Sequence, residues 1–262
     1  MTTSPLLPLT AADLPPLAPE LVLIGSAFAL MILDLFVSNR NKIVTHLFSL
    51  AALAVVLFML ATGVGGQGEV FHGMFVRDTA ADVMKTGIVL LSGLTLVYGW
   101  RYLRDRNLFQ GEIPVLILFG TAGMMILVSA GSLLMVYLGL ELLALCSYAL
   151  VASNRENGLA SEAAMKYIVL GSLASGLLLY GMSLIYGATG SLHLDVIRDA
   201  IPHSEERVLL ITGAVFMIAG VAFKLGAAPF HMWLPDVYQG APAPIALFII
   251  SAPKLAAFGL DY

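Results

Sequence analysis

The sequence predicts an all-α integral membrane protein of about eight transmembrane helices. Of the 262 residues, 59% are hydrophobic and 11% are charged, and the mean hydropathy is +0.92. A soluble domain usually carries about 25% charged residues, so most of this surface cannot face water. The apolar residues also form long continuous runs, and a bilayer core about 30 Å thick needs roughly 20 of them per helix.

The apolar runs follow one another with short connections. Residues 1–20 contain no Lys or Arg, unlike the basic start of a signal peptide, so we expect the first span itself to be the membrane anchor. The expected spans are 21–37, 43–62, 81–102, 114–130, 132–152, 166–187, 208–224 with a broken continuation, and 243–260.

Basic residues are distributed unevenly between the two sets of loops. Those in or beside the loops after odd-numbered spans are Arg40, Lys42, Arg101, Arg104, Arg106, Arg155 and Lys166. The opposite loops hold only Arg77, Arg198 and Arg207. Because loops rich in Lys and Arg stay in the cytoplasm, we expect the N-terminus outside and the odd spans running inward.

Three ionisable residues lie where lipid would otherwise surround the chain: Glu141 in the fifth span, Lys224 in the seventh and Lys254 in the eighth. A charge at the bilayer centre costs at least a few kcal/mol, so such residues face a bundle interior or water and usually mark an ion path. At about 1.5 Å per residue, Glu141 lies roughly 14 Å, and Lys224 roughly 20–24 Å, below the outer ends of their spans. The long lysine stem leans outward and closes much of that gap. A purely structural ion pair is the alternative.

The backbone beside both lysines is abnormal for a span. Gly226 and Pro229 follow Lys224, and Pro253 directly precedes Lys254. A proline breaks the helical hydrogen bonding, and the freed carbonyls must then be satisfied by protein or water. Pro253 is expected to leave the Ile249 carbonyl as an acceptor one turn from the ammonium. A simple kink is the alternative, but broken helices recur at the ion sites of transporters.

Lysine suits a proton relay, since burial disfavours its charged form and a neighbouring carboxylate favours it. We hypothesise that movement of Glu141 toward or away from Lys224 decides whether this lysine holds its proton. Lys254 is then the next carrier.

Weaker candidates lie near these three. His231 titrates near neutral pH and is either a relay or a packing residue at the helix break. Lys166 follows Glu162 by four residues, an ordinary stabilising helix pair, and is a candidate for the inner mouth of the path.

Other residues are interpreted structurally. The residues expected at the membrane interface are Asp34, Asp82 and Lys85, and the small residues expected to allow close helix packing are Gly171, Ala174, Ser175 and Gly176. No Walker A or dinucleotide-binding glycine motif, and no spacing of Fe–S or haem ligands, occurs in the sequence. The net charge of −4 disfavours nucleic-acid binding.

Several motifs resemble those of a known family. The stretch 223–242, FKLGAAPFHMWLPDVYQGAP, resembles the central signature of the antiporter-like subunits of bacterial respiratory complex I, which are related to the Mrp-type sodium/proton antiporters. The stretch 137–143, YLGLELL, is similar to their glutamate motif. The stretches EAAMKY (162–167), GSLASGLLLYG (171–181) and SAPKLAAF (251–258) look most like the subunit N group, rather than the L or M paralogues.

The resemblance implies roles for individual residues. Glu141 and Lys224 would be the coupling pair, Lys254 the central lysine, and Lys166 and His231 auxiliary positions. It also implies a membrane-arm subunit of an NADH-quinone oxidoreductase in the bacterial inner membrane. That subunit translocates protons and binds no cofactor itself, while partner subunits bind NADH, FMN, Fe–S clusters and the quinone.

Family members have about fourteen spans, with two inverted five-helix repeats. Here residues 1–110 are expected to be the leading helices and residues 111–262 the first repeat. The second repeat and its lysine are then expected to be missing, either because this is a fragment or because the gene product is truncated. Two rival functions stay open: a subunit of an Mrp-type cation/proton antiporter, and an inactive or assembly-only fragment.

Overall fold

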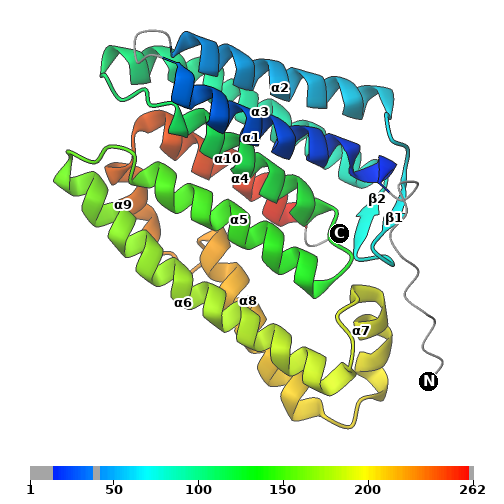
Figure 1. Ribbon diagram of the computed structural model, residues 1–262. Coiled ribbons are helices and arrows are strands. Elements are labelled where there is room, and N and C mark those ends of the chain that lie inside the picture. Colours follow the sequence, from blue (N-terminus) through cyan, green and yellow to red (C-terminus); the bar gives the residue numbers. More distant parts are fainter. Residues whose placement is uncertain (1–13, 38–41, 260–262) are drawn as a thin grey trace.

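The computed structural model describes residues 14–37 and 42–259, which are mostly helical (Figure 1). The long helices are α1 (Ala18–Phe36), α2 (Ile43–Thr62), α3 (Thr79–Asp105), α4 (Glu112–Val128), α5 (Leu133–Val151), α6 (Gly158–Thr189), α8 (Arg207–Leu225) and α10 (Ala243–Phe258). Among the described residues, six of these are long and apolar enough to cross a membrane alone, and α4 and α10 are shorter apolar helices. The predicted all-α class with about eight spans is confirmed.

Two of the loops contain short elements that were not predicted. The expected loop after α2 contains a hairpin of β1 (Gly68–Val70) and β2 (Phe75–Arg77), and the loop after α6 contains α7 (Leu194–Ala200). The broken continuation of the seventh span is a separate short helix, α9 (Trp233–Gly240). Residue 260, the expected end of the eighth span, lies outside the described residues.

The long helices run side by side in a bundle (Figure 1). Helices α1, α2 and α3 lie along one side, α6 and α8 along the other, and α4, α5 and α10 between them. A Cβ atom on Gly181 of α6 would lie 2.6 Å from the carbonyl oxygen of Gly213 on α8, so only glycine allows this close approach.

Of the small residues expected to allow close packing, Gly171 lies against the Tyr148 ring of α5. The Ala174 carbonyl oxygen would lie 3.0 Å from a Cβ on Gly220 of α8, whereas a Cβ on Gly176 would meet nothing within 4 Å. The expectation is therefore confirmed for Gly171 and Ala174 and wrong for Gly176.

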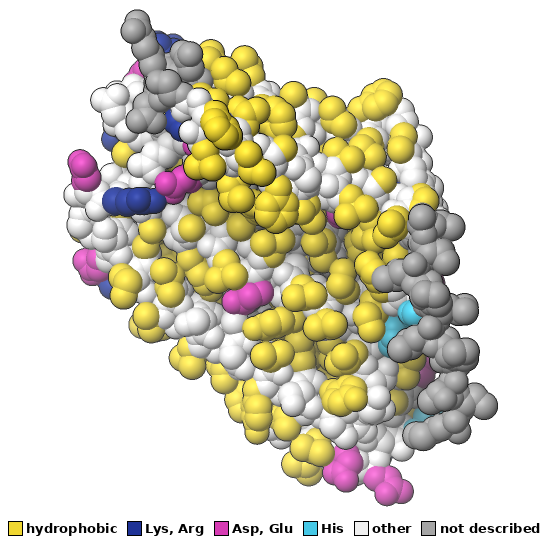
Figure 2. Space-filling view, in the orientation of Figure 1, with side chains coloured by type: hydrophobic (Ala, Val, Ile, Leu, Met, Phe, Trp, Pro, Cys, Tyr) yellow, Lys and Arg dark blue, Asp and Glu magenta, His cyan; other side chains and the backbone are white. Residues whose placement is uncertain are grey.

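The face of the bundle seen in Figure 2 is strongly apolar. On α8, the side chains of Val208, Ile211, Val215 and Ile218 are all exposed. In water such a surface would be costly, but lipid chains solvate it without penalty. The surface composition therefore fits a multi-pass membrane protein.

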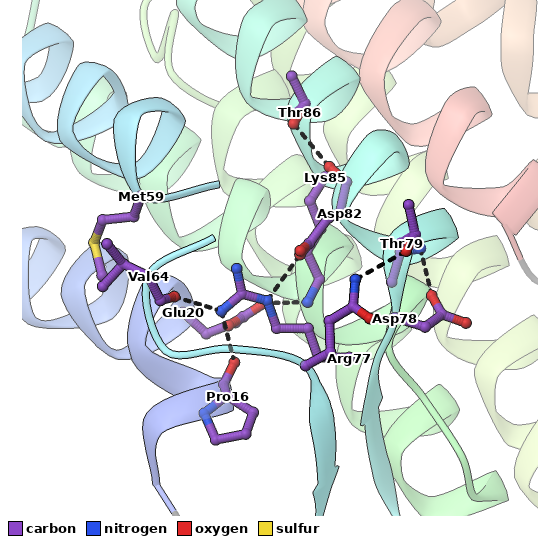
Figure 3. Close-up of polar contacts among 12 residues, drawn as sticks. Pro16, Glu20, Met59, Val64, Arg77, Asp78, Thr79, Asp82, Lys85 and Thr86 are labelled. Atoms are coloured by element: carbon purple, nitrogen blue, oxygen red, sulfur yellow. Dashed lines mark hydrogen bonds and ion pairs between the residues drawn. The ribbon is translucent and has the colours of Figure 1, made fainter. Parts of the chain in front are cut away.

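A buried ionic cluster ties the hairpin to α1 and α3 (Figure 3). The Nζ atom of Lys85 on α3 lies 2.7 Å from Oε1 of Glu20 on α1, and both side chains are at most 1% exposed. Beside them, Nε of Arg77 donates to Oδ1 of Asp82 at 2.8 Å, and its Nη1 donates to the Val64 carbonyl.

The sequence located Lys85 near the start of a span but did not indicate that its side chain is fully buried, covered by the hairpin and α1. Its location at the membrane interface stays a prediction. The Phe75 ring of β2 lies 4.9 Å from its ammonium and closes the site on one side.

Candidate functional site

Glu141, Ser175 and Lys224 form one hydrogen-bonded chain between α5, α6 and α8. The Ser175 hydroxyl donates to Oε2 of Glu141 at 2.7 Å, and Nζ of Lys224 donates to that hydroxyl at 3.1 Å. The direct distance from Nζ of Lys224 to Oε2 of Glu141 is 4.0 Å. This exceeds a hydrogen bond, so the serine connects the two charged groups.

Helix α8 ends where Lys224 can reach this chain. Gly226 has a φ of +72°, a conformation that favours glycine, and its N–H bonds to the Phe223 carbonyl. The N–H of Ala227 bonds to the Ala222 carbonyl at 2.8 Å, which completes a Schellman motif. The helix therefore ends at Leu225 and is capped by Gly226. This cap lies three residues before Pro229, the residue that the sequence suggested as the break.

Lys254 satisfies the carbonyls that this ending leaves free. Its Nζ donates to the carbonyl of Lys224 at 3.4 Å and to that of Leu225. The C-terminal end of a helix carries partial negative charge, so an ammonium is favoured there. The expectation that freed carbonyls need a partner is confirmed. The partner of Lys254, however, is the end of α8 across the bundle, whereas the sequence suggested the Ile249 carbonyl within its own helix.

Trp233 holds α9 against the end of α8. Its indole Nε1 donates to the Phe223 carbonyl at 2.9 Å, and the side chain is almost fully buried. The ring stacks on Tyr167 of α6 with a centroid distance of 4.6 Å, and it lies 5.9 Å from Nζ of Lys254. The two halves of the broken helix are therefore fixed to each other by one aromatic side chain.

A small cavity of about 40 Å³ lies beside Lys224, among α5, α6, α8, α9 and α10. Its polar lining includes Ser147, Tyr148 and Tyr167, and Pro253, the residue before Lys254, also lines it. A cavity that holds a water needs roughly 10–15 Å³ and a few polar partners, and both requirements are met. A water there would lie between the segments that carry the two lysines.

Lys166 and His231 lie outside this chain of contacts. Nζ of Lys166 lies 2.9 Å from Glu162 and 3.1 Å from Asp236 of α9, and all three side chains are roughly half exposed. His231, between α8 and α9, is exposed. The pairing of Lys166 with Glu162 is confirmed, and Asp236 adds a second carboxylate that the helix spacing could not indicate. Their auxiliary roles stay predictions.

Ser175 is the residue that the sequence reading missed, since it was interpreted as a packing residue. Its burial was foreseeable from the small residues around it. Its bonding was not, because Glu141 lies 34 positions earlier and Lys224 lies 49 positions later. Within the described residues, no group of three or more His, Cys, Asp or Glu side chains could hold a metal ion.

Chemically, the arrangement joins a carboxylate, a hydroxyl and an ammonium in one half-buried hydrogen-bonded line. The side chains of Glu141 and Lys224 are 25% and 14% exposed. Each member has a position for a proton, and neighbouring members are within hydrogen-bond distance of each other. Such a line can pass a proton from one helix to the next across α5, α6 and α8.

Known proteins resemble this chain in sequence. A sequence model of the NADH:quinone oxidoreductase/Mrp antiporter transmembrane family matches residues 130–261. Subunit N of the NADH-quinone oxidoreductase of Xanthomonas euvesicatoria is 81% identical over the whole chain, and that of Halorhodospira halophila is 50% identical over 92% of it. The aligned regions are 54% and 50% of those proteins, so the chain spans about half the length of the curated relatives it matches.

Solved structures agree. A chain of respiratory complex I from Thermus thermophilus with bound aureothin matches with a TM-score of 0.77 and 32% identity, over 93% of this chain and 52% of that one. A chain of the Mrp complex from Dietzia matches with a TM-score of 0.72 and 22% identity, over 96% of this chain and 48% of that one, which is a likeness of fold alone. The resemblance found in the sequence motifs is confirmed. This chain therefore belongs to the NADH:quinone oxidoreductase/Mrp antiporter transmembrane family.

Proposed function

We propose that this chain forms the first antiporter-like half of a proton-translocating membrane-arm subunit of an NADH-quinone oxidoreductase. Glu141 and Lys224 are its coupling pair and Lys254 is the next carrier. The observation that carries this proposal is the continuous hydrogen-bonded line from Glu141 through Ser175 to Lys224. The 81% identity to a subunit N supports this function over that of an Mrp-type antiporter subunit.

In the proposed mechanism, the separation of Glu141 and Lys224 controls where the proton lies. When the carboxylate is close, it stabilises the ammonium of Lys224. When the carboxylate moves away, the buried ammonium loses its counter-charge and releases its proton toward Lys254 through the cavity. Lys254 itself is stabilised by the carbonyls at the end of α8.

The remaining expectations belong to the same proposal. Residues 1–110 are the leading helices, and residues 111–262 are the first repeat. Lys166 and His231 act as auxiliary residues. NADH, FMN, Fe–S clusters and quinone are bound by partner subunits, and the chain contributes proton transfer alone.

The N-terminus is proposed to lie outside the bacterial inner membrane. At the hairpin end of the bundle, Arg77 is buried against Asp82, so its charge is neutralised there. The arginines exposed near that end are Arg198 and Arg207. The opposite end has more basic residues, which supports a cytoplasmic location for it.

Two measurements on the assembled complex test the function. A tagged chain should co-purify with NADH dehydrogenase activity, and failure to do so contradicts the proposed partners. Membrane vesicles should lose most NADH-driven proton uptake in the Glu141→Gln variant, while Arg155→Gln, an exposed charge change, should retain it. Full uptake by Glu141→Gln would exclude the coupling role.

A further inference from the structure

We propose that Ser175 is itself a proton carrier, whose hydroxyl passes the proton between Lys224 and Glu141. This inference rests on the proposed function and extends it to a third residue. The hydroxyl is the one group within hydrogen-bond distance of both charged ends among the described side chains. The two ends are 4.0 Å apart, too far for direct transfer in this arrangement.

The bonding of Ser175 differs from that of other hydroxyl groups in this bundle. Ser147, Thr95 and Ser251 each donate to the carbonyl four residues earlier in their own helix. That is the usual way for a helical Ser or Thr to satisfy its hydroxyl within its own helix. Ser175 instead donates across the bundle to Glu141, although it is only 4% exposed. A residue needed only for its small size would not require this bond.

The transfer step balances without any further reactant. When Glu141 is protonated and Lys224 is neutral, the Glu141 O–H bond breaks as an O–H bond forms on Ser175, and the original Ser175 O–H breaks as an N–H bond forms on Lys224. The products are a carboxylate, an unchanged serine and an ammonium, with Lys224 donating to Ser175 and Ser175 donating to Glu141 as in the structure. Because both transfers occur together, the serine never carries a full charge, which a site with little water would disfavour.

The position of Ser175 on a tightly packed helix explains how the relay keeps its geometry. A Cβ atom on Gly220 of α8 would lie 3.0 Å from the carbonyl oxygen of Ala174 and 2.8 Å from Cβ of Leu178. The α6 and α8 backbones are therefore as close as glycine permits beside Ser175. Movement of α5 relative to this rigid pair changes the Ser175–Glu141 distance while the Ser175–Lys224 distance stays fixed. Ser175 thus keeps its hydrogen bond to Lys224, while movement of α5 makes or breaks the hydrogen bond between the Ser175 hydroxyl and the Glu141 carboxylate.

The experiment compares Ser175→Ala, Ser175→Cys and Ser175→Thr in the assembled complex in membrane vesicles. Ser172→Ala is the matched control, because Ser172 lies on the same helix, is exposed and donates only to Val169. Proton uptake and NADH oxidation are measured together, in H₂O and in D₂O, after the amount of assembled complex has been determined on native gels.

We expect uptake per NADH oxidised to fall by at least about tenfold in the Ala variant, since a positioned proton-transfer group typically contributes about 10²–10⁴-fold to a rate. The Cys variant should fall as well, since a thiol is a weak hydrogen-bond donor, and it tests the proposal even where the Ala variant does not assemble. Thr keeps the hydroxyl and should retain uptake. The ratio of the uptake rate in H₂O to that in D₂O should be larger for the wild type than for the Cys variant. The reason is that two protons move together only when the Ser175 hydroxyl is present.

Two results separate the inference from the function it extends. If Glu141→Gln and Lys224→Met lose uptake while the Ala and Cys variants of Ser175 retain it, Ser175 is a packing residue and only this inference is overturned. If Glu141→Gln and Lys224→Met also retain uptake, the proposed function is overturned with it. Equal losses in the Thr and Ala variants would show that packing at Ser175 matters and not its hydroxyl, and would likewise overturn the inference.

Discussion

The ammonium of Lys254 donates to the main-chain carbonyl of Lys224 at 3.4 Å, so α10 is bonded to the very residue whose side chain belongs to the Glu141 site. The bond joins the two lysines through the end of one helix. A change in the ending of α8 would therefore move both lysines at once. The end of α8 therefore couples the position of Lys254 to that of the Lys224 side chain.

Replacement of Lys254 by Met should both destabilise the bundle and stop proton uptake. The carbonyls of Lys224 and Leu225 lose their donor, and each buried unsatisfied acceptor costs about 1–3 kcal/mol. Lys254→Arg keeps a donor there and should retain more of the thermal stability. Thermal unfolding in detergent and vesicle proton uptake measure the two effects. A Met variant with wild-type unfolding temperature would contradict the contacts described here.

Replacement of Gly220 by Ala should slow proton uptake although glycine itself has no chemistry. The new methyl group would meet Leu178 and the Ala174 carbonyl, so α6 and α8 must separate beside Ser175. Gly176→Ala is the matched control, because a Cβ there meets nothing within 4 Å. The comparison is made by uptake per assembled complex. Equal uptake in the two variants would mean that the spacing of α6 and α8 is not critical.

The Glu20–Lys85 pair should act on stability and not on proton uptake. Removing one partner leaves a buried charge uncompensated, which costs about 3–5 kcal/mol. Glu20→Gln and Lys85→Met should each lower the unfolding temperature, whereas the double variant should recover much of the loss. Uptake per assembled complex should match the wild type in all three. Additive losses in the double variant would show that the two side chains are not energetically coupled.

Replacement of Lys166 by Gln should slow proton uptake with little change in stability. Its ion pairs with Glu162 and Asp236 are about half exposed, and such pairs contribute about 0–1 kcal/mol. Arg155→Gln removes a comparably exposed pair with Glu112 and serves as the control. If the two variants take up protons at the same rate, Lys166 has no auxiliary role.

The sequence predicted the long helices well because each one follows from its own composition. The apolar runs and the charged residues between them can be recognised from neighbouring residues alone. The same holds for the end of α8, although Gly226 and not Pro229 ends the helix. The hairpin and α7 were not predictable in the same way. They are short, and their formation depends on packing against the ends of the long helices.

The candidate site was predictable only in part, because its parts come from separate helices. Charge within an apolar run identified Glu141, Lys224 and Lys254. Ser175 carries no charge, and only the crossing of α5, α6 and α8 shows what its hydroxyl contacts. For the same reason, Glu20 and Lys85 could be seen as charged residues near span ends but not as a buried pair.

The most direct test of the central claim is the ratio of protons taken up to NADH oxidised in vesicles that carry Lys224→Met in the assembled complex. Lys224 joins the Glu141 site by its side chain and the Lys254 site by its carbonyl. This ratio is expected to fall well below that of the wild type and of Arg155→Gln. A wild-type ratio in the Lys224→Met variant would contradict the central claim.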